Sequence, residues 1–427
     1  MILNCDVGGP SPSSQITIFA TSVTFTLRSL ISAPLYNIFG HRVIIPSALA
    51  YVLYVDAFLS TSYAFTIAAV AILGIGAGFL WTAQAGIMMS YPAEQDKGKT
   101  GATIGAVIPV VNEWNSKDSA VKQSTYIAFI VIMTFGALLT LALLRSNKVV
   151  RADGSRVSFH KISNWKRETI EVLKLFKDPR MLILIPLFAG SNWFYTYQFN
   201  GIKSPGFTSI RARDLNNFLY WLFQIIGAGL FGVFLDPTKI GSRKARAIYG
   251  NILNLVIITA LWIAAIFIQK GYTRESVLAP DYVKLDITDP KYPGIVVVYA
   301  LFGVIDAMYQ DYIYWLLGTM TNDVERAARY GGFYKTIQNA CNAVANQLEA
   351  KKVSYMAQLI IVFTINVVGL LLALIVAKGI PDVTIENLED GHAVGTLVGG
   401  QLEDIGDGNG SVHLSERLSD KVDKSEV

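Results

Sequence analysis

Long apolar stretches separated by short polar ones dominate the chain. Nine stretches of 17 or more residues are apolar, at about 16–39, 43–62, 64–90, 125–144, 181–200, 216–235, 248–268, 293–318 and 356–377. About 20 helical residues cross the roughly 30 Å hydrocarbon core of a bilayer. Backbone groups in that core find no water, so each crossing segment must form a helix. The pattern predicts an all-α, multi-pass membrane protein rather than a soluble α/β protein.

A tenth helix is predicted from a polar pattern. Residues 330–349 would fail a hydropathy window, yet one face of a helix here would be polar and the other mostly apolar. The polar positions are Lys335, Gln338, Asn339, Asn342 and Asn346. A crossing helix suits a bundle in which the polar face meets partner helices or a water-filled cavity. The alternative is an interfacial helix that lies on the membrane.

Polar intervals divide the chain into four parts. These are an incomplete N-terminal helical half (1–144), a central loop (145–180), a C-terminal six-helix half (181–378) and a tail (379–427). Within the loop, apolar residues at helical spacing between 165 and 176 predict a helix on the membrane surface. The tail is rich in Gly, Asp, Glu and Ser, so we expect it to be disordered.

Basic residues predict the orientation. With the central loop in the cytoplasm, the cytoplasmic loops carry nineteen Lys and Arg and the opposite loops eleven. The positive-inside rule then places the central loop and the C-terminal tail in the cytoplasm. The net charge of +4 does not indicate a nucleic-acid partner, because the charges lie in the connections between spans. Which membrane houses the protein is not readable.

Charged and amide side chains inside the spans are the candidate site. Asp306 lies near the middle of 293–318 and shares a face with Tyr309 and Gln310. We expect Asp311 to pair with Lys335 on the next helix, which leaves Asp306 facing Asn339 and Asn342. The functional interpretation is a proton- or cation-responsive centre in a cavity. The structural one is an interhelical polar lock that only orients helices.

Further polar side chains could face the same cavity. Asn192, Tyr195 and Gln198 repeat along one side of 181–200, and Trp81 introduces polarity late in 64–90. For the aromatic residues the alternative is anchoring at the headgroup level. The glycines between 74 and 78 lie in an apolar helix with no preceding strand, so they indicate close helix packing and not a nucleotide loop.

Other chemistry has little support. Two cysteines and four histidines form no metal-ligand pattern, and no nucleophile, base and acid arrangement stands out in the loops. We therefore expect no enzymatic activity, no catalytic residues, no metal and no cofactor.

Two loops carry similar motifs. Ala33-x3-Asn37-x2-Gly40-x-Arg42 follows the first apolar stretch, and Gly232-x3-Asp236-x4-Gly241-x-Arg243 follows 216–235. Both resemble the loop motif of the major facilitator superfamily, although Ala33 and Asn37 replace its Gly and Asp. The second copy is two residues longer than the motif.

Longer strings make the resemblance more specific. GIGAGFLWTAQAGIMMSYP (74–92), SNWFYTYQFN (191–200), YWLLGTMTND (314–323) and GFYKTIQNACNAVA (332–345) closely resemble the fungal-type Unc-93-like branch of that superfamily. The resemblance implies a twelve-helix bundle of two pseudo-symmetric halves around a central cavity. It implies either a transporter of a small solute or ion, or a non-transporting accessory protein that regulates or chaperones a channel or receptor.

The chain departs from this twelve-helix plan. Compared with this plan, the first span is expected to be lacking, and only GATIGAVIPVV (101–111) stands where a fifth span is expected. Eleven helical residues extend about 16 Å, half of the membrane. Either this segment re-enters or the first spans insert inverted. A truncated or mis-spliced gene model is our preferred explanation, and a genuinely shortened paralogue is the alternative.

Overall fold

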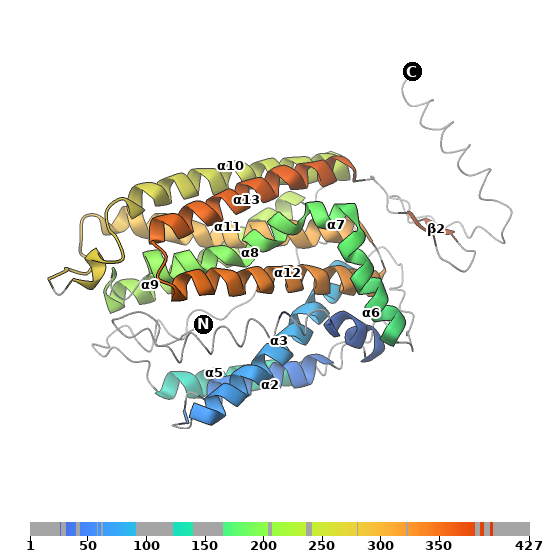
Figure 1. Cartoon of the computed structure of the whole chain (residues 1–427), viewed down its shortest axis with the longest axis horizontal. Coiled ribbons are helices and arrows are strands. Elements are labelled where there is room, and N and C mark those ends of the chain that lie inside the picture. The colour runs from blue at the N-terminus through green and yellow to red at the C-terminus, as the bar shows by residue number, and fades with distance from the viewer. Residues whose placement is uncertain are drawn as a thin grey trace, which may run out of the picture.

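Helices make up nearly all of the described structure. The computed structural model describes residues 31–39, 43–57, 63–90, 123–139, 165–203, 207–235, 241–279, 281–321 and 323–380, with short pieces at 26, 59–60, 385–387 and 393–395. Residues 31–39 are helical and precede α2. The further helices are α2 (Ile44–Asp56), α3 (Tyr63–Ser90), α5 (Gln123–Leu139), α6 (Trp165–Lys174), η4 (Leu175–Lys177), α7 (Pro179–Ile183), α8 (Ile185–Tyr197), η5 (Gln198–Ile202), α9 (Ile210–Leu235), α10 (Arg243–Gln269), η7 (Ser276–Leu278), α11 (Tyr292–Thr319), α12 (Val324–Ala350) and α13 (Tyr355–Lys378) (Figure 1).

The helices fall where the apolar stretches predict them. Among the described residues, five are long and apolar enough to cross a membrane: Ala64–Gly86, Arg211–Leu235, Arg243–Gln269, Tyr292–Thr319 and Tyr355–Lys378. The predicted short segment 101–111 and the loop residues 145–164 lie outside the described residues. In the tail, where we expected disorder, β1 (Ile385–Asn387) and β2 (Ala393–Gly395) form a small antiparallel ribbon. The other residues from 381 onward lie outside the described residues.

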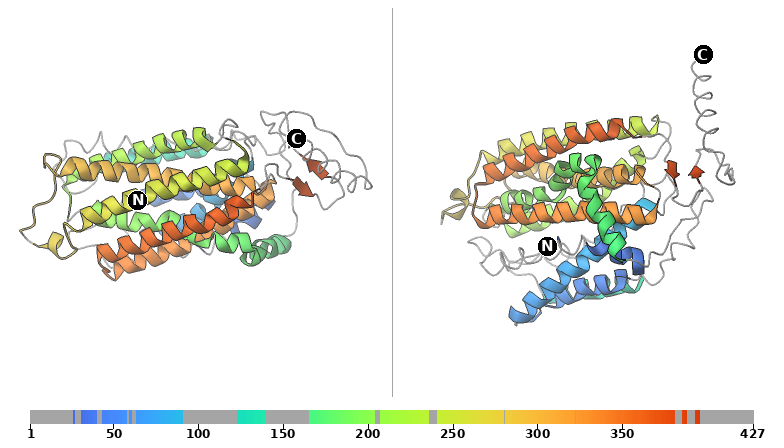
Figure 2. Two further views of the ribbon diagram at one scale, coloured as in Figure 1. Left: turned by 90° about the horizontal axis from the view of Figure 1, so that it is seen from above. Right: turned by 45° about the vertical axis from the view of Figure 1, so that its right-hand side comes forward.

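The helices form two groups that α12 joins. The elements α8 to α13 pack into one bundle, which we call the C-terminal half, and α2, α3 and α5 form the described N-terminal half (Figures 1 and 2). Helix α12 packs against both α3 and α8. The side chains at the junction of the two halves therefore come largely from α3 and α12.

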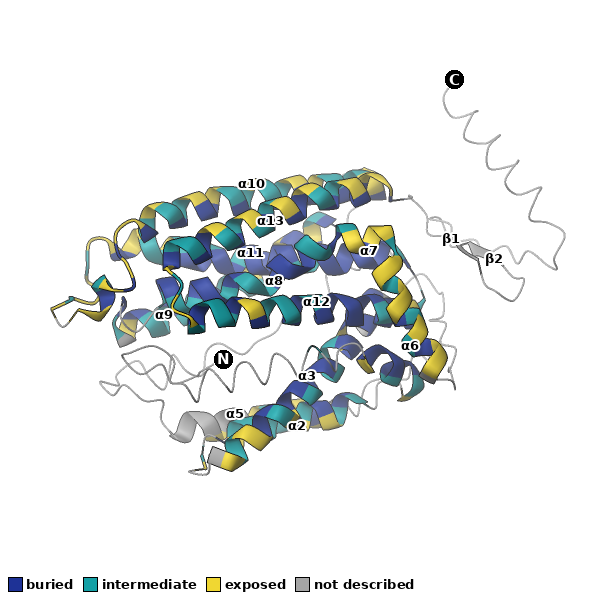
Figure 3. Cartoon of the chain, viewed as in Figure 1, coloured by how far each residue is buried: buried dark blue, intermediate teal, exposed yellow. Residues whose placement is uncertain are grey.

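The polar helix α12 belongs to the bundle. Its 27 residues extend about 40 Å, enough to cross a bilayer. The Asp323 carboxylate caps its first turn by accepting the backbone N–H groups of Glu325 and Arg326 at 2.6 and 3.1 Å. Lys335 and Gln338 are only 3% and 1% exposed. The burial of this part of the polar face disfavours the alternative of an interfacial helix, although Asn342 and Asn346 further along α12 are half-buried (Figure 3).

Glycine permits close packing of α2 and α3. A Cβ atom added at Gly76 would lie 2.5 Å from the Cβ of Ala50 and 3.0 Å from the carbonyl oxygen of Ser47. Both distances are shorter than ordinary van der Waals contact, so a larger residue would push the two helices apart. The predicted packing role of this glycine-rich segment is confirmed.

We call the end of the bundle where α6 lies the α6 end, and the other the opposite end, where the loop 270–291 lies. Asp286 fastens this loop by accepting hydrogen bonds from the Ser209 hydroxyl and the Arg211 guanidinium. The Ser209 hydrogen bond, together with Arg211, holds the pKa of the Asp286 carboxyl below its ordinary value.

We expect the loop to be released in acid. A lowered pKa adds stability above the pKa of the unfolded state, and that stability is lost as the pH falls through the folded-state pKa. Amide protection of 281–289, corrected for the intrinsic exchange rate, should therefore fall below about pH 4. Asp286→Asn should remove the pH dependence. Unchanged amide protection of this loop in the wild type at pH 3 would contradict the role of the Asp286 carboxylate in holding it.

Candidate functional site

Asp306 lies at the centre of a cage of hydrogen-bond donors. It is fully buried near the middle of α11. Its Oδ2 accepts hydrogen bonds from the Tyr195 hydroxyl and the Gln224 amide, both at 2.6 Å, and from the Tyr220 hydroxyl at 3.2 Å. Its Oδ1 accepts the Gln310 amide at 2.6 Å. Four donors from three helices thus satisfy a carboxylate that is costly at this depth.

A π-helical turn shapes the α8 side of the cage. The end of α8 continues into η5, where Gln198 Oε1 lies 3.0 Å from the Tyr220 hydroxyl and shares its single hydrogen with Asp306. The ring of Phe199 stacks on Tyr195 with a centroid distance of 5.2 Å. Such π turns insert one residue into a helix and are frequent at functional sites. Gln198, the first residue of the turn, and Tyr195 on α8 both contact this cluster, as the sequence predicts.

Lys335 lies in an aromatic box at the junction of the halves. Its ammonium donates to Gln338 Oε1 at 2.8 Å and lies over the rings of Tyr334, Trp81 and Tyr314, at 4.7, 4.8 and 5.4 Å from their centroids. Aromatic faces stabilise a cation more strongly when it is withdrawn from water. Two of the three rings, Tyr334 and Tyr314, belong to the C-terminal half, whereas Trp81 belongs to α3 of the N-terminal half.

Gln338 connects the aromatic box to the Asp306 cage. Its amide nitrogen carries two hydrogens and lies within hydrogen-bond distance of three acceptors: Ser191 Oγ at 2.8 Å, the Tyr334 hydroxyl at 2.9 Å and Gln310 Oε1 at 3.5 Å. Gln310 in turn donates to Asp306. A chain of polar contacts therefore leads from the Lys335 ammonium to the Asp306 carboxylate, and the 3.5 Å contact between Gln338 and Gln310 is its longest step.

The predicted ion pair between Asp311 and Lys335 does not form. Lys335 instead donates to Gln338, and among the described residues Asp311 Oδ2 is buried and accepts no hydrogen bond. The reason is helical geometry. Asp311 follows Asp306 by five residues, about 140° around α11, whereas Gln310 follows it by four and stays on its face.

The other predicted residues are only partly brought together. Asn339 donates to the backbone carbonyl of Lys335 at 2.6 Å, so its amide does not face Asp306. The carbonyl of Asn342 accepts the Asn346 amide in the same way at 2.8 Å. Tyr309 packs edge-on against Phe194. Asn192 is half-buried on α8, and among the described residues it makes no hydrogen bond to the cage.

Tyr220 and Gln224 belong to the cage but were not predicted from the sequence. Both lie on α9, four residues apart, inside an otherwise apolar predicted span. That spacing places two hydrogen-bonding side chains on one helical face, which is the signal that could have identified them.

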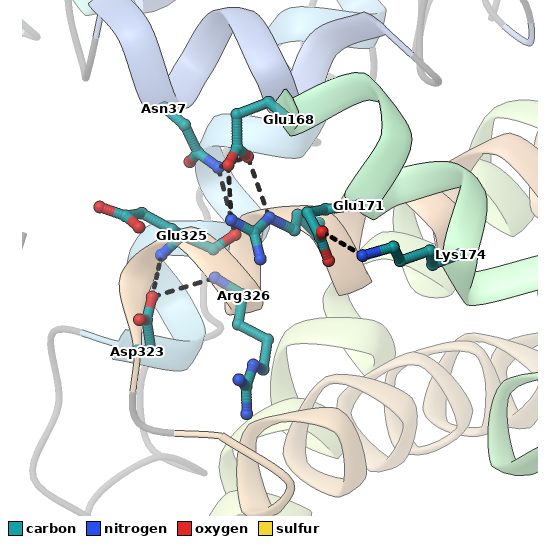
Figure 4. A network of polar contacts seen from close by, with 8 residues as sticks. Asn37, Glu168, Glu171, Lys174, Asp323, Glu325 and Arg326 are labelled. Atoms are coloured by element: carbon teal, nitrogen blue, oxygen red, sulfur yellow. Dashed lines mark hydrogen bonds and ion pairs between the residues drawn. The ribbon is translucent and has the colours of Figure 1, made fainter. Parts of the chain in front are cut away.

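A second polar network lies at the α6 end (Figure 4). The carboxylate of Glu168 on α6 accepts the Asn37 amide at 2.8 Å and two hydrogen bonds from the Arg329 guanidinium at 2.5 and 2.9 Å. Asn37 also donates to the backbone carbonyl of Glu325 at 3.3 Å. Asn37 of the first loop motif therefore connects the N-terminal half to α6 and α12.

The remaining loop-motif residues are only partly described. Gly232 is buried near the end of α9, and Arg243 begins α10 and is 7% exposed. Gly241 has a φ of +121°, a backbone conformation that side chains disfavour, directly before the α10 cap Ser242. Gly40, Arg42 and Asp236 lie outside the described residues.

Comparisons with known proteins agree with this architecture. Residues 13–377 match the family model "Ion channel regulatory protein UNC-93". UNC93-like protein 1 of Arabidopsis thaliana is 38% identical over 368 residues, which are 82% of this chain and 79% of that protein. An UNC93-like protein of Schizosaccharomyces pombe is 38% identical over 295 residues, 66% of this chain and 58% of the relative.

Solved structures show the same fold at low sequence identity. The Escherichia coli fucose:proton symporter FucP aligns with a TM-score of 0.55 and 12% identity, covering 86% of this chain and 91% of the symporter. The proton:xylose symporter XylE aligns with a TM-score of 0.56 and 11% identity, covering 86% of each chain. The chain is thus an integral, multi-pass membrane protein of the UNC-93 family, with the helical fold of the major facilitator superfamily.

Proposed function

We propose that this protein is a secondary transporter that moves a small solute or ion through alternating movements of its two halves, with the Asp306 cage as its charged centre. The buried carboxylate is the observation that carries the proposal. A charge at mid-membrane costs roughly 2.5–3.5 kcal/mol on insertion scales, so it persists where it has partners or a role. Donors from three helices converge on Asp306, which suits a site that holds charge away from water.

The contact between the halves supports a moving site. Trp81 of α3 covers the Lys335 ammonium, and Lys335 connects to Asp306 through Gln338 and Gln310. A movement of one half against the other would uncover this ammonium. The charge distribution near Asp306 would then change with the position of the halves, which is what coupling a solute to a conformational change needs.

The charges of α11 and α12 favour a cation or a proton as the coupled species. Asp306 and Asp311 bring two carboxylates to this region, and Lys335 brings one ammonium. Asp311 Oδ2 is buried and accepts no hydrogen bond in the described structure, so this oxygen can take up a proton or contact a cation. We infer that the transported or co-transported species is cationic.

Neutralising Asp306 tests the proposal. Purified protein in liposomes should give currents under a proton, sodium or potassium gradient, measured on a solid-supported membrane. Asp306→Asn keeps the size of the side chain and removes its charge, so the current should fall at least about tenfold. Asp281→Asn, in an exposed loop, should leave it unchanged. A normal current from folded Asp306→Asn protein would exclude Asp306 from the mechanism.

We also infer that the α6 end faces the cytoplasm. The loops that the sequence places on the side of the central loop, to which α6 belongs, carry nineteen Lys and Arg against eleven on the other side, and basic residues are retained on the cytoplasmic side. A protease site introduced into the C-terminal tail should be cut only in inside-out vesicles. Cleavage in sealed right-side-out vesicles would reverse the orientation.

A second function is favoured by the family description, which names an ion channel regulatory protein. In that case the chain would bind a channel and carry no solute itself. This alternative predicts a stoichiometric membrane partner after gentle solubilisation, and no current from the purified chain in liposomes. A protein that purifies alone and gives currents would contradict it.

A further inference from the structure

Helix α6 crosses the α6 end of the bundle and presents two different faces (Figures 1 and 4). The inward face carries Glu168 and Val172, which are 0% and 1% exposed. In the following turn, the ring of Phe176 packs edge-on against Phe333 of α12 with a centroid distance of 4.8 Å. This face is therefore fastened to the bundle by packing and by the ion pair of Glu168 with Arg329.

The outward face combines apolar and basic side chains. Ile170 and Leu173 are 54% and 50% exposed. They are about one helical turn apart, so they lie on one face and form one apolar patch. Lys166 lies on the same side at about 100° per residue, and Lys177 ends the 3₁₀ turn η4 that follows α6; both are also exposed. Long basic side chains beside an apolar stripe are typical of helices that lie at the boundary of headgroups and acyl chains.

We propose that the outward face of α6 binds anionic lipid headgroups, with Ile170 and Leu173 inserted among the acyl chains. Charge complementarity selects this occupant. Four basic residues lie between 165 and 177, and one of the two acidic residues there, Glu168, is turned inward and paired with Arg329. Each basic residue near an anionic membrane surface strengthens binding roughly fivefold. Because α6 is attached to a membrane-spanning bundle, the membrane surface lies close to this helix.

Lipid binding would reach the junction of the halves through Glu168. The same helix that holds the membrane with one face holds Asn37 of the N-terminal half and Arg329 of the C-terminal half with the other. If lipid fixes α6 in place, Glu168 remains between these two partners. Anionic lipid should therefore favour the state in which the α6 end is closed.

Hydrogen exchange of the full-length protein tests the proposal. We compare nanodiscs of phosphatidylcholine with nanodiscs that also contain about 30% phosphatidylserine, a fraction chosen to give a clearly negative surface potential. In the wild type, phosphatidylserine should slow exchange in 165–177 at least about threefold, as expected if one basic residue engages. The first turns of α12, 324–331, should slow with it.

Three variants separate the steps. Lys166→Gln/Lys177→Gln and Ile170→Ser/Leu173→Ser should each lose the lipid response of α6, because each removes one half of the outward face. Glu168→Gln should keep the response in α6 but lose it in α12. The matched control is Lys351→Gln/Lys352→Gln, which removes two exposed basic residues at the opposite end and should respond like the wild type.

Two results would overturn the proposal. One is an equal exchange rate of residues 165–177 in both lipid compositions. This comparison uses only the wild-type protein, so it does not depend on whether a variant folds. The other is protection of α6 only when a co-purified protein is present, because the outward face would then be a protein contact and not a lipid contact.

Discussion

Arg274→Ala is expected to lower the free energy of unfolding of the detergent-solubilised protein by about 3–5 kcal/mol. The Arg274 guanidinium makes two parallel hydrogen bonds to the Glu349 carboxylate, at 2.6 and 2.8 Å. The side chains are 10% and 5% exposed, so truncation leaves a buried carboxylate without its cation. The guanidinium also lies 4.0 Å from the Tyr355 ring centroid, and this contact would be lost as well.

Two controls identify the cause of this loss. Arg274→Gln/Glu349→Gln removes both charges together and should recover part of the stability, since no unpaired charge remains. Arg211→Ala removes an ion pair with Asp286 in which the arginine side chain is 55% exposed, and should cost at most about 1 kcal/mol. Chemical unfolding followed by tryptophan fluorescence measures all three. Equal losses for Arg274→Ala and Arg211→Ala would contradict the role of burial.

Gly227→Leu is expected to destabilise the C-terminal half by about 3 kcal/mol. A Cβ atom at Gly227 would lie 2.8 Å from the Cα of Val304 on α11, and backbone atoms cannot move aside as a side chain can. Helices α9 and α11 would have to separate. These two helices supply Gln224 and Asp306, so the variant should also disturb the cage.

Gly229→Leu provides the matched control within the same helix. Two residues further along α9, an added Cβ atom meets nothing within 4 Å. This position is exposed, so leucine should be neutral or slightly stabilising, because glycine is a poor helix former. Thermal unfolding in detergent compares the two variants. Similar midpoints would show that α9 and α11 do not pack as closely as described.

The sequence predicts the fold well because membranes constrain it strongly. An apolar stretch in a bilayer can only be a helix or part of a closed barrel, so 356–377 and 293–318 predict α13 and α11 to within one residue at each end. Even the polar helix α12 could be predicted, because its polar side chains repeat at helical spacing. The family predicted from longer strings such as 332–345 is confirmed by the match of residues 13–377 to the family model.

The candidate site was predicted only in part, because sequence spacing does not fix which helices are neighbours. Asp306, Gln310, Tyr195 and Gln198 come together as expected, since each follows from polarity inside an apolar span. The pairing of Lys335 with Asp311 failed because equal depth on two helices does not make two side chains face each other. Glu168 gave no signal, since a carboxylate in a charged loop is normally solvated.

The current carried by the purified protein alone, reconstituted in liposomes under proton, sodium and potassium gradients, tests the central claim most directly. If Asp306 is the charged centre of a transporter, at least one gradient should drive a current without any other protein, and Asp306→Asn should lower it at least about tenfold. If folded protein carries no current under any of these gradients and only alters the current of a co-purified channel, the transport function is contradicted.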